Sequence, residues 1–135
     1  MAVELTKDSI DLGIVIRDAD ASLAFYRDLL GFELVGEMPM PVGGGTMYRL
    51  MCGTSTIKLV HPATEPPARA PPGGIPGAYG YRYWTISVSN LAEITDQCAA
   101  AGHTVVVPVR EIREGVSISI VEDPDGNWVE FLQIA

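Results

Sequence analysis

The sequence predicts an α+β protein built from two βαβββ modules. A helix-capping residue and a closing glycine recur at nearly the same spacing, with Asp18 and Gly31 13 positions apart and Asn90 and Gly102 12 positions apart. Three strand-like segments follow each of these helices. Because the agreement extends over about 70 residues of unbiased sequence, it indicates an internal duplication.

The first module begins with an apolar run at 12–16 that is typical of a strand. Asp18 or Asp20 can cap the following helix, and Gly31 ends it. The apolar residues of this helix recur at helical spacing, and they are Leu23, Phe25, Tyr26, Leu29 and Leu30. The three strands expected after the helix are 32–36, 46–51 and 56–60.

The second module repeats this plan. A strand is expected at 84–88, and Asn90 precedes a helix that Gly102 ends. The apolar face of this helix consists of Leu91, Ile94, Cys98 and Ala101. Strands are then expected at 104–107, 116–121 and 128–134. A tight turn precedes the last strand, because Pro124 presets φ and Gly126 allows a positive φ.

The two modules are joined by a stretch rich in proline and glycine. Residues 61–82 contain six prolines and four glycines, which favours a linker that passes over the surface. We therefore expect one domain over 1–135, with module one at about 9–61, the linker at about 62–81 and module two at about 82–134.

Composition excludes several classes of partner. The net charge is −8 and there is no run of Lys or Arg, so nucleic acid and anionic membranes are poor partners. No apolar stretch is long enough to span a bilayer, and no signal peptide is evident, so we expect a cytoplasmic protein. Cys52 and Cys98 stand far apart without a metal-binding or redox motif, and they predict no disulfide framework.

Three features together indicate a resemblance to a known family. They are the Asp-Pro-Asp-Gly-Asn-x-x-Glu motif at 123–130, the helix end at 25–32 and the duplicated spacing. A chain with these features resembles the vicinal oxygen chelate superfamily, and the resemblance covers roughly 11–133. This superfamily includes glyoxalase I, extradiol dioxygenases, methylmalonyl-CoA epimerase, and bleomycin and fosfomycin resistance proteins. The resemblance implies that the two modules form a curved mixed sheet around a cup, and that the protein is a homodimer.

The resemblance also locates the positions at which metal-dependent members hold a metal. Those positions are occupied here by Asp11, Lys58, Tyr83 and Glu130, and only Glu130 keeps the family residue. An ammonium group repels a cation, and two carboxylates are too few for a durable transition-metal site. We therefore expect no metal and no cofactor.

Strand alternation supplies the remaining site candidates, which we expect on the face of the sheet that lines the cup. Pairing across the turn at 52–55 places Arg49 opposite Lys58 and Met51 opposite Thr56. A carboxylate among large apolar residues in the middle of a strand costs free energy unless it has a partner or a function, which draws attention to Glu130. We expect the catalytic candidates to be Glu130, Lys58, Asp11 and Tyr83, and the ligand-binding candidates to be Arg49, Met47, Met51, Thr85, Ser117, Ser119 and Trp128. For Ser117 and Ser119 a simple lining role is favoured over ligand binding.

Each charged candidate has a chemical role in this interpretation. Asp11 or Glu130 is a general base, Lys58 or Arg49 holds a carboxylate, enolate or phosphate, and Tyr83 donates a hydrogen bond or a proton. The alternative is that Asp11–Lys58 and Arg49–Glu130 are compensating ion pairs that remain where a metal site was lost.

The leading hypothesis is a metal-independent enzyme that catalyses proton transfer, isomerisation or elimination on a small anionic or carbonyl-bearing metabolite. One alternative is a non-catalytic protein that sequesters a drug or another small molecule, and the net charge of −8 would suit a cationic ligand. The other alternative is a metal-dependent lyase or dioxygenase.

Overall fold

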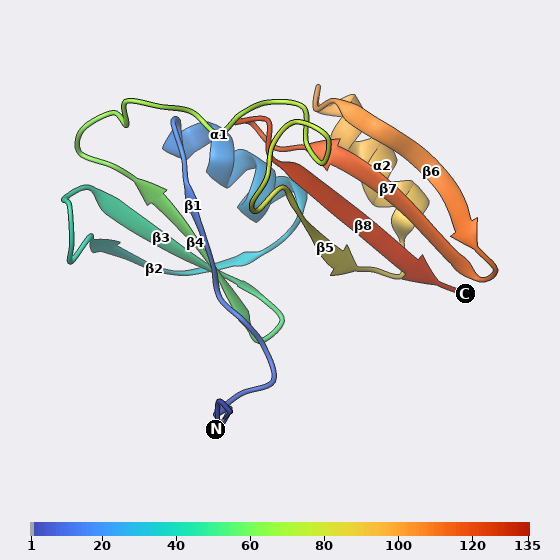
Figure 1. Ribbon diagram of the computed structural model, residues 1–135, viewed down its shortest axis with the longest axis horizontal. Coiled ribbons are helices and arrows are strands. Elements are labelled where there is room, and N and C mark those ends of the chain that lie inside the picture. Colours follow the sequence, from blue (N-terminus) through green and yellow to red (C-terminus); the bar gives the residue numbers. More distant parts are fainter. Residues whose placement is uncertain (1) are drawn as a thin grey trace. The chain divides into compact units, whose positions relative to one another are not determined.

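The computed structural model describes residues 2–135, and the chain divides into two compact units. The N-terminal unit ends at Pro67, and the C-terminal unit runs from Ala68 to Ala135. Each unit contains an open four-stranded mixed sheet and one helical segment (Figure 1). The predicted α+β class with two βαβββ modules is therefore confirmed.

The N-terminal unit has the strand order β1-β4-β3-β2. Its elements are β1 (Leu12–Val15), α1 (Ala19–Leu23), the π-helical segment η1 (Ala24–Leu29), β2 (Glu33–Pro39), β3 (Thr46–Cys52) and β4 (Ser55–His61). β1 is parallel to β4, and the other two pairings are antiparallel. The helical segment connects β1 to β2 at the opposite edge of the sheet, and the chain returns through β3 and β4 until β4 pairs with β1.

The helical segment begins at Asp18, one of the two predicted caps. The Asp18 side chain accepts a hydrogen bond from the Ala21 N–H at 3.1 Å. The second half of the helix widens, because the Leu30 N–H donates to the Phe25 carbonyl five residues back, at 2.9 Å. Phe25 and its neighbour Tyr26 are both fully buried, with ring centroids 4.7 Å apart in a T-shaped arrangement.

The C-terminal unit repeats the topology with the order β5-β8-β7-β6 (Figure 1). Its elements are β5 (Tyr83–Ser87), α2 (Leu91–Ala100), β6 (Val105–Arg113), β7 (Val116–Glu122) and β8 (Trp128–Ile134). α2 packs on β6, β7 and β8 and buries Ile94 and Cys98. Its first N–H group, that of Leu91, donates to Gln133 Oε1 at 2.8 Å, so a side chain from β8 satisfies the helix start, whereas the Asn90 side chain does not.

Two strands are longer than the sequence predicts. β2 continues beyond the expected end at residue 36, and β6 continues well beyond residue 107. The pairing of β6 with β7 shifts register between Val107 and Arg110, in the segment that contains Pro108. A proline lacks the N–H group that a regular strand ladder needs, so in a sequence it suggests that a strand ends there. Here a bulge on the edge strand β6 accommodates it.

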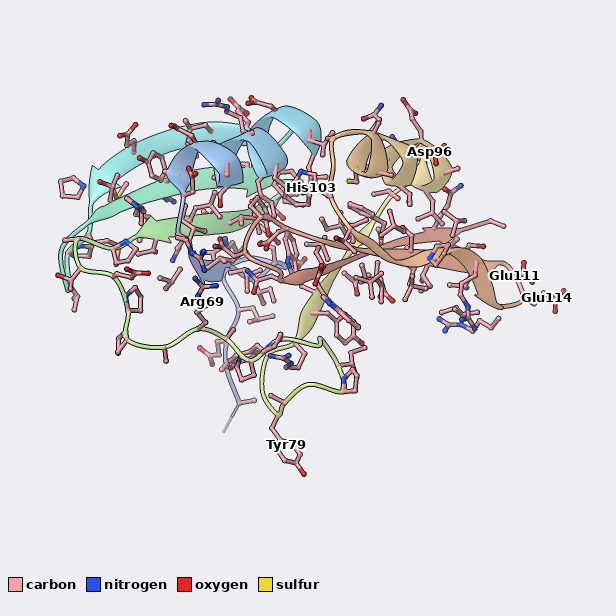
Figure 2. All side chains as sticks on the ribbon, turned by 90° about the horizontal axis from the view of Figure 1, so that it is seen from above. Arg69, Tyr79, Asp96, His103, Glu111 and Glu114 are labelled. Atoms are coloured by element: carbon pink, nitrogen blue, oxygen red, sulfur yellow. The ribbon has the colours of Figure 1, made fainter. Side chains whose placement is uncertain are left out.

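The C-terminal part of the predicted linker is held against its own unit. Arg82 Nε donates to the Gly74 carbonyl at 2.6 Å, and Arg82 Nη2 donates to the Pro71 carbonyl at 2.7 Å. Gly74 is buried, whereas Tyr79 is fully exposed and points away from the rest of this loop (Figure 2). The guanidinium group thus closes residues 71–82 into a compact loop.

Among the described residues, no helix combines the length and apolar character that a membrane crossing requires.

Candidate functional site

One face of the N-terminal sheet carries two rows of paired residues that run across all four strands. Residues that pair directly across neighbouring strands share a face of the sheet. The first row is Gly13, Lys58, Arg49 and Gly36, and the second row is Val15, Val60, Met47 and Met38. We call these the cation row and the apolar row.

The cation row confirms the predicted register of β3 and β4. Arg49 pairs directly with Lys58, and Met51 pairs with Thr56, as the sequence predicts. Both cations are half-buried, and neither forms a salt bridge with a described residue of the N-terminal unit. Met38 is an addition to the predicted set. It was missed because the strand was expected to end at residue 36, two positions before Met38.

Asp11 has a different partner from the one predicted. Its Oδ1 accepts hydrogen bonds from Lys7 Nζ at 2.7 Å and from the Thr56 N–H at 3.0 Å. Asp11 therefore does not form the ion pair with Lys58 that the alternative interpretation expected. The Lys7 hydrogen bond, and after it the Thr56 N–H, lowers the pKa of Asp11, while Lys58 contributes only a weaker attraction. A lowered pKa makes Asp11 a poorer base, and its catalytic role stays a prediction.

The Lys7 contact predicts a pH effect. In Lys7→Met the pKa of Asp11 is expected to rise towards its ordinary value, which a carboxyl ¹³C NMR titration measures. A lowered pKa stabilises the fold above the unfolded-state value of about 4, and this stabilisation disappears as the pH falls through the folded-state value. The variant should therefore be slightly less stable than the wild type at pH 6, and the two should be equally stable at a pH below the folded-state pKa of Asp11. As a control, Lys58→Met should move the pKa less. A larger shift in the control would contradict the assignment of Lys7 as the main partner.

The C-terminal sheet brings four candidates onto one face. Tyr83 pairs with Trp128, and Thr85 pairs with Glu130, so these four residues share one face of the sheet. Thr85 Oγ1 donates to Glu130 Oε1 at 2.6 Å, and Ile120 pairs with Glu130 from the other side. Glu130 is half-buried and forms no salt bridge with a described residue of this unit. Its carboxylate is thus oriented by a neutral hydroxyl.

Ser117 and Ser119 lie on the opposite face from Glu130, so the predicted face is wrong for both. Ser119 pairs with Phe131, is fully buried, and has its Oγ 2.7 Å from Thr95 Oγ1 of α2. Ile118 and Ile120 share the Glu130 face instead. The residues of β7 are buried on both faces, so its alternation of Ser and Ile does not indicate which face the helix covers.

Trp128 is partly covered by the loop closed by Arg82. A Cβ atom added to Gly74 would overlap the Trp128 indole, so the glycine backbone lies directly against the ring. Trp128 is half-buried, and a flat ligand would have to share the indole with this loop. Ligand stacking on Trp128 stays a prediction.

The turn before β8 is organised by Asp123, which the sequence analysis did not single out. Its Oδ1 accepts from the N–H groups of Asp125 at 2.9 Å and Asn127 at 2.8 Å, and its Oδ2 accepts from Asn127 Nδ2 at 3.0 Å. Gly126 has a φ of 85°, as predicted for this turn. These bonds fix the point at which β8 begins, and so determine which residues of β8 share the face of Glu130.

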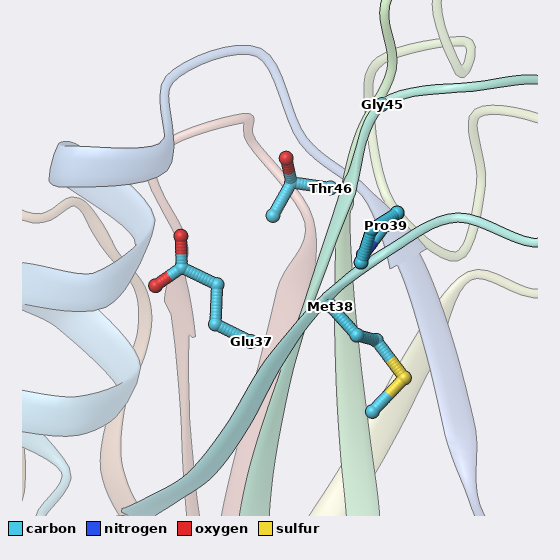
Figure 3. A pocket seen from close by; sticks show the side chains of 5 residues that line it. All are labelled: Glu37, Met38, Pro39, Gly45 and Thr46. Atoms are coloured by element: carbon cyan, nitrogen blue, oxygen red, sulfur yellow. The ribbon is translucent and has the colours of Figure 1, made fainter.

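A shallow pocket of about 400 Å³ lies where β2 ends and β3 begins, and none of the catalytic candidates lines it. It is lined by Glu37, Met38, Pro39, Gly45 and Thr46. Figure 3 shows the Glu37 and Met38 side chains pointing to opposite sides of β2. Only Met38 belongs to either row, so this pocket by itself does not define a binding site.

Neither cysteine suits nucleophilic catalysis. Both are free thiols, and Cys98 is fully buried. Burial raises the pKa of Cys98 to about 11 and also raises the pKa of Cys52. Both thiols are therefore protonated near neutral pH.

The residues at the four family metal positions do not fit a metal ion. Asp11 Oδ1 is engaged by an ammonium and an N–H group, Glu130 Oε1 by a hydroxyl, and Lys58 is itself a cation. Across residues 2–135, no three His, Cys, Asp or Glu side chains gather in a way that could hold one. Donors of this kind do not form the His and carboxylate set that a transition metal requires.

Comparison with known proteins agrees with this fold. Residues 9–131 match the family model of the Glyoxalase/Bleomycin resistance protein/Dioxygenase superfamily. The lactoylglutathione lyase of Neisseria meningitidis is 29% identical over 121 residues, covering 87% of this chain and 84% of the relative. A probable lactoylglutathione lyase of Synechocystis is 29% identical over 126 residues, covering 89% and 90%.

A solved structure extends the likeness to three dimensions. A glyoxalase family protein from Bacillus cereus has a TM-score of 0.83 at 16% identity, covering 98% of this chain and 96% of that one. At this identity the likeness shows the fold alone. With the family match spanning nearly the whole sequence, the chain belongs to the glyoxalase/bleomycin resistance protein/dioxygenase superfamily.

Proposed function

We propose that this protein is a metal-independent enzyme that transfers a proton on a small anionic or carbonyl-bearing metabolite, in an isomerisation or elimination. The main support is the contact between Thr85 Oγ1 and Glu130 Oε1 at 2.6 Å, on a sheet face that also carries Tyr83. A half-buried carboxylate oriented by a hydroxyl has the form of a general base.

In the proposed mechanism Glu130 takes the proton from a carbon next to the carbonyl group. The electron pair of the broken C–H bond moves into the carbonyl, which becomes an enolate. Return of the proton to a neighbouring carbon completes an isomerisation, and departure of a group with its electron pair completes an elimination. Thr85 keeps the carboxylate in one orientation, and Tyr83 donates a hydrogen bond or a proton. The role of Lys58 or Arg49 in holding an oxyanion stays a prediction about the N-terminal unit.

The names of the relatives support a lyase-type reaction. Two proteins at 29% identity are named as lactoylglutathione lyase or probable lactoylglutathione lyase. We extend the reaction class to this chain and leave the substrate open. The homodimer and the cytoplasmic location implied by the resemblance and the sequence also stay predictions.

Exchange of substrate protons with deuterated water tests this function. The protein is incubated in D₂O with a panel of 2-oxo acids, hydroxyketones and S-lactoylglutathione, and ¹H NMR follows the loss of the proton next to the carbonyl. The proposal predicts exchange above the buffer rate for at least one member. Binding of panel members without any exchange or product would instead favour the sequestering alternative.

A further inference from the structure

The cation row presents two positive charges side by side on the N-terminal sheet. Arg49 and Lys58 are directly opposite each other on adjacent antiparallel strands. Like charges in this position repel and destabilise the sheet. Asp11, a carboxylate of this unit, is engaged by Lys7 at 2.7 Å.

We propose that Arg49 and Lys58 form one binding site for the carboxylate of an organic acid, whose apolar part lies on the apolar row. The proposal rests on the proposed function only in naming the substrate as an anionic carbonyl compound. It differs from the oxyanion role above, because it assigns to the pair a charge that the ligand carries permanently.

The glycines at the two ends of the cation row leave room beside Lys58 and Arg49. An added Cβ at Gly13 would have no neighbour within 4 Å. At Gly36 an added Cβ would meet only Met38 Cε at 3.8 Å and Arg49 Cδ at 4.0 Å. Because the strands next to Lys58 and Arg49 carry no side chain in this row, a ligand can approach both cations along the sheet surface.

The neighbouring row supplies an apolar surface. Val15, Val60, Met47 and Met38 follow the cation row across the same four strands. Methionine side chains adapt to ligands of different shape. A ligand with a charged end and an apolar body matches this combination better than inorganic phosphate does.

The two cations are chemically complementary. The Arg49 guanidinium offers a planar fork that matches the two oxygens of a carboxylate, and the Lys58 ammonium adds a compact positive charge. An anion placed between them removes their mutual repulsion, so ligand binding and sheet stability are linked.

Binding of a simple carboxylate tests the site without any turnover. The probes are 3-phenylpropanoate, its neutral amide 3-phenylpropanamide, and inorganic phosphate, each titrated into the full chain carrying ¹³C-labelled methionine methyl groups. The carboxylate is expected to shift the Met38 and Met47 signals and to bind at least tenfold more tightly than the amide and than phosphate. Its affinity should fall as salt is raised.

Variants assign the effect to the cation row. Arg49→Gln and Lys58→Met should each weaken carboxylate binding at least tenfold, whereas Arg17→Gln, which removes an exposed cation of the same unit, should change it less than twofold. Lys58→Arg keeps the charge and should retain most of the binding. Each row variant should melt at the same temperature as the wild type or a higher one, since it removes a like-charge pair.

Equal affinity for carboxylate and amide, tighter binding of phosphate, or unchanged binding in both row variants would each overturn the proposal. Failure of the proton-exchange test with intact carboxylate binding would remove the enzymatic proposal and leave this site standing. Absence of carboxylate binding with intact proton exchange would remove this site and leave the enzymatic proposal standing.

Discussion

Replacement of Glu130 by Gln is expected to lower the proton-exchange rate about 10²–10⁴-fold, the usual contribution of a positioned general base. The amide keeps the shape of the side chain and can still accept from Thr85 through its oxygen, but it cannot take up a proton. Because the Thr85 contact at 2.6 Å is preserved in form, the fold and the affinity should change little. The measurement is the exchange rate at saturating substrate together with the dissociation constant, which separates loss of chemistry from loss of binding.

Two further variants sharpen this prediction. Thr85→Val removes the hydroxyl that orients the carboxylate while keeping the side-chain shape, and should slow exchange by about tenfold, consistent with the loss of one positioning hydrogen bond. Glu111→Gln changes an exposed carboxylate on β6 of the same unit and should leave the rate within twofold of the wild type. Exchange by Glu130→Gln at the wild-type rate would show that another group is the base.

The largest expected effect on stability comes from Gly74→Ala. The new Cβ would overlap the Trp128 indole, and the backbone φ of +57° is strained for any residue with a side chain. Overpacking costs about 1–3 kcal/mol and the left-handed conformation about 1–2 kcal/mol, so the variant should lose about 2–5 kcal/mol. Urea unfolding, followed through Trp fluorescence and circular dichroism, measures the loss.

Gly53→Ala is the matched control for this variant. Gly53 has nearly the same φ, +59°, but an added Cβ would find nothing within 4 Å. It should therefore show only the conformational cost, about 1–2 kcal/mol. Equal losses in the two variants would mean that the loop does not press on Trp128. A greater loss for Gly74→Ala would establish that the loop and β8 stabilise each other.

The sequence predicted best where a short turn fixes the register of neighbouring strands. The turn between β3 and β4 determines the pairing of Arg49 with Lys58, and the predicted range 128–134 coincides with β8. Both results follow from local turn chemistry and the two-residue period of a strand. The duplicated helix spacing likewise predicted that both units have the same βαβββ succession of elements.

Features that depend on distant contacts were not predictable in this way. Ser119 was placed on the wrong face because β7 is buried on both sides, and only the packing of α2 settles its direction. The role of Gly74 depends on a ring more than 50 positions away. Gln133 at the start of α2 is a similar case, since a glutamine in a strand gives no local sign of capping a helix.

The partner of Asp11 was not predicted, for another reason. Lys7 precedes the first strand, outside the strands whose alternation supplied the site candidates. A lysine four positions before a carboxylate was visible in the sequence, but its position outside any predicted element removed it from consideration.

The central claim is that Glu130 transfers a proton without help from a metal ion. The most direct measurement is the proton-exchange rate of protein stripped with a chelator, with its metal content determined by mass spectrometry. Stripped protein is expected to keep the full rate, and added Zn²⁺, Ni²⁺ or Fe²⁺ is expected not to increase it. Loss of exchange on stripping, with recovery at one equivalent of any of these ions, would contradict it.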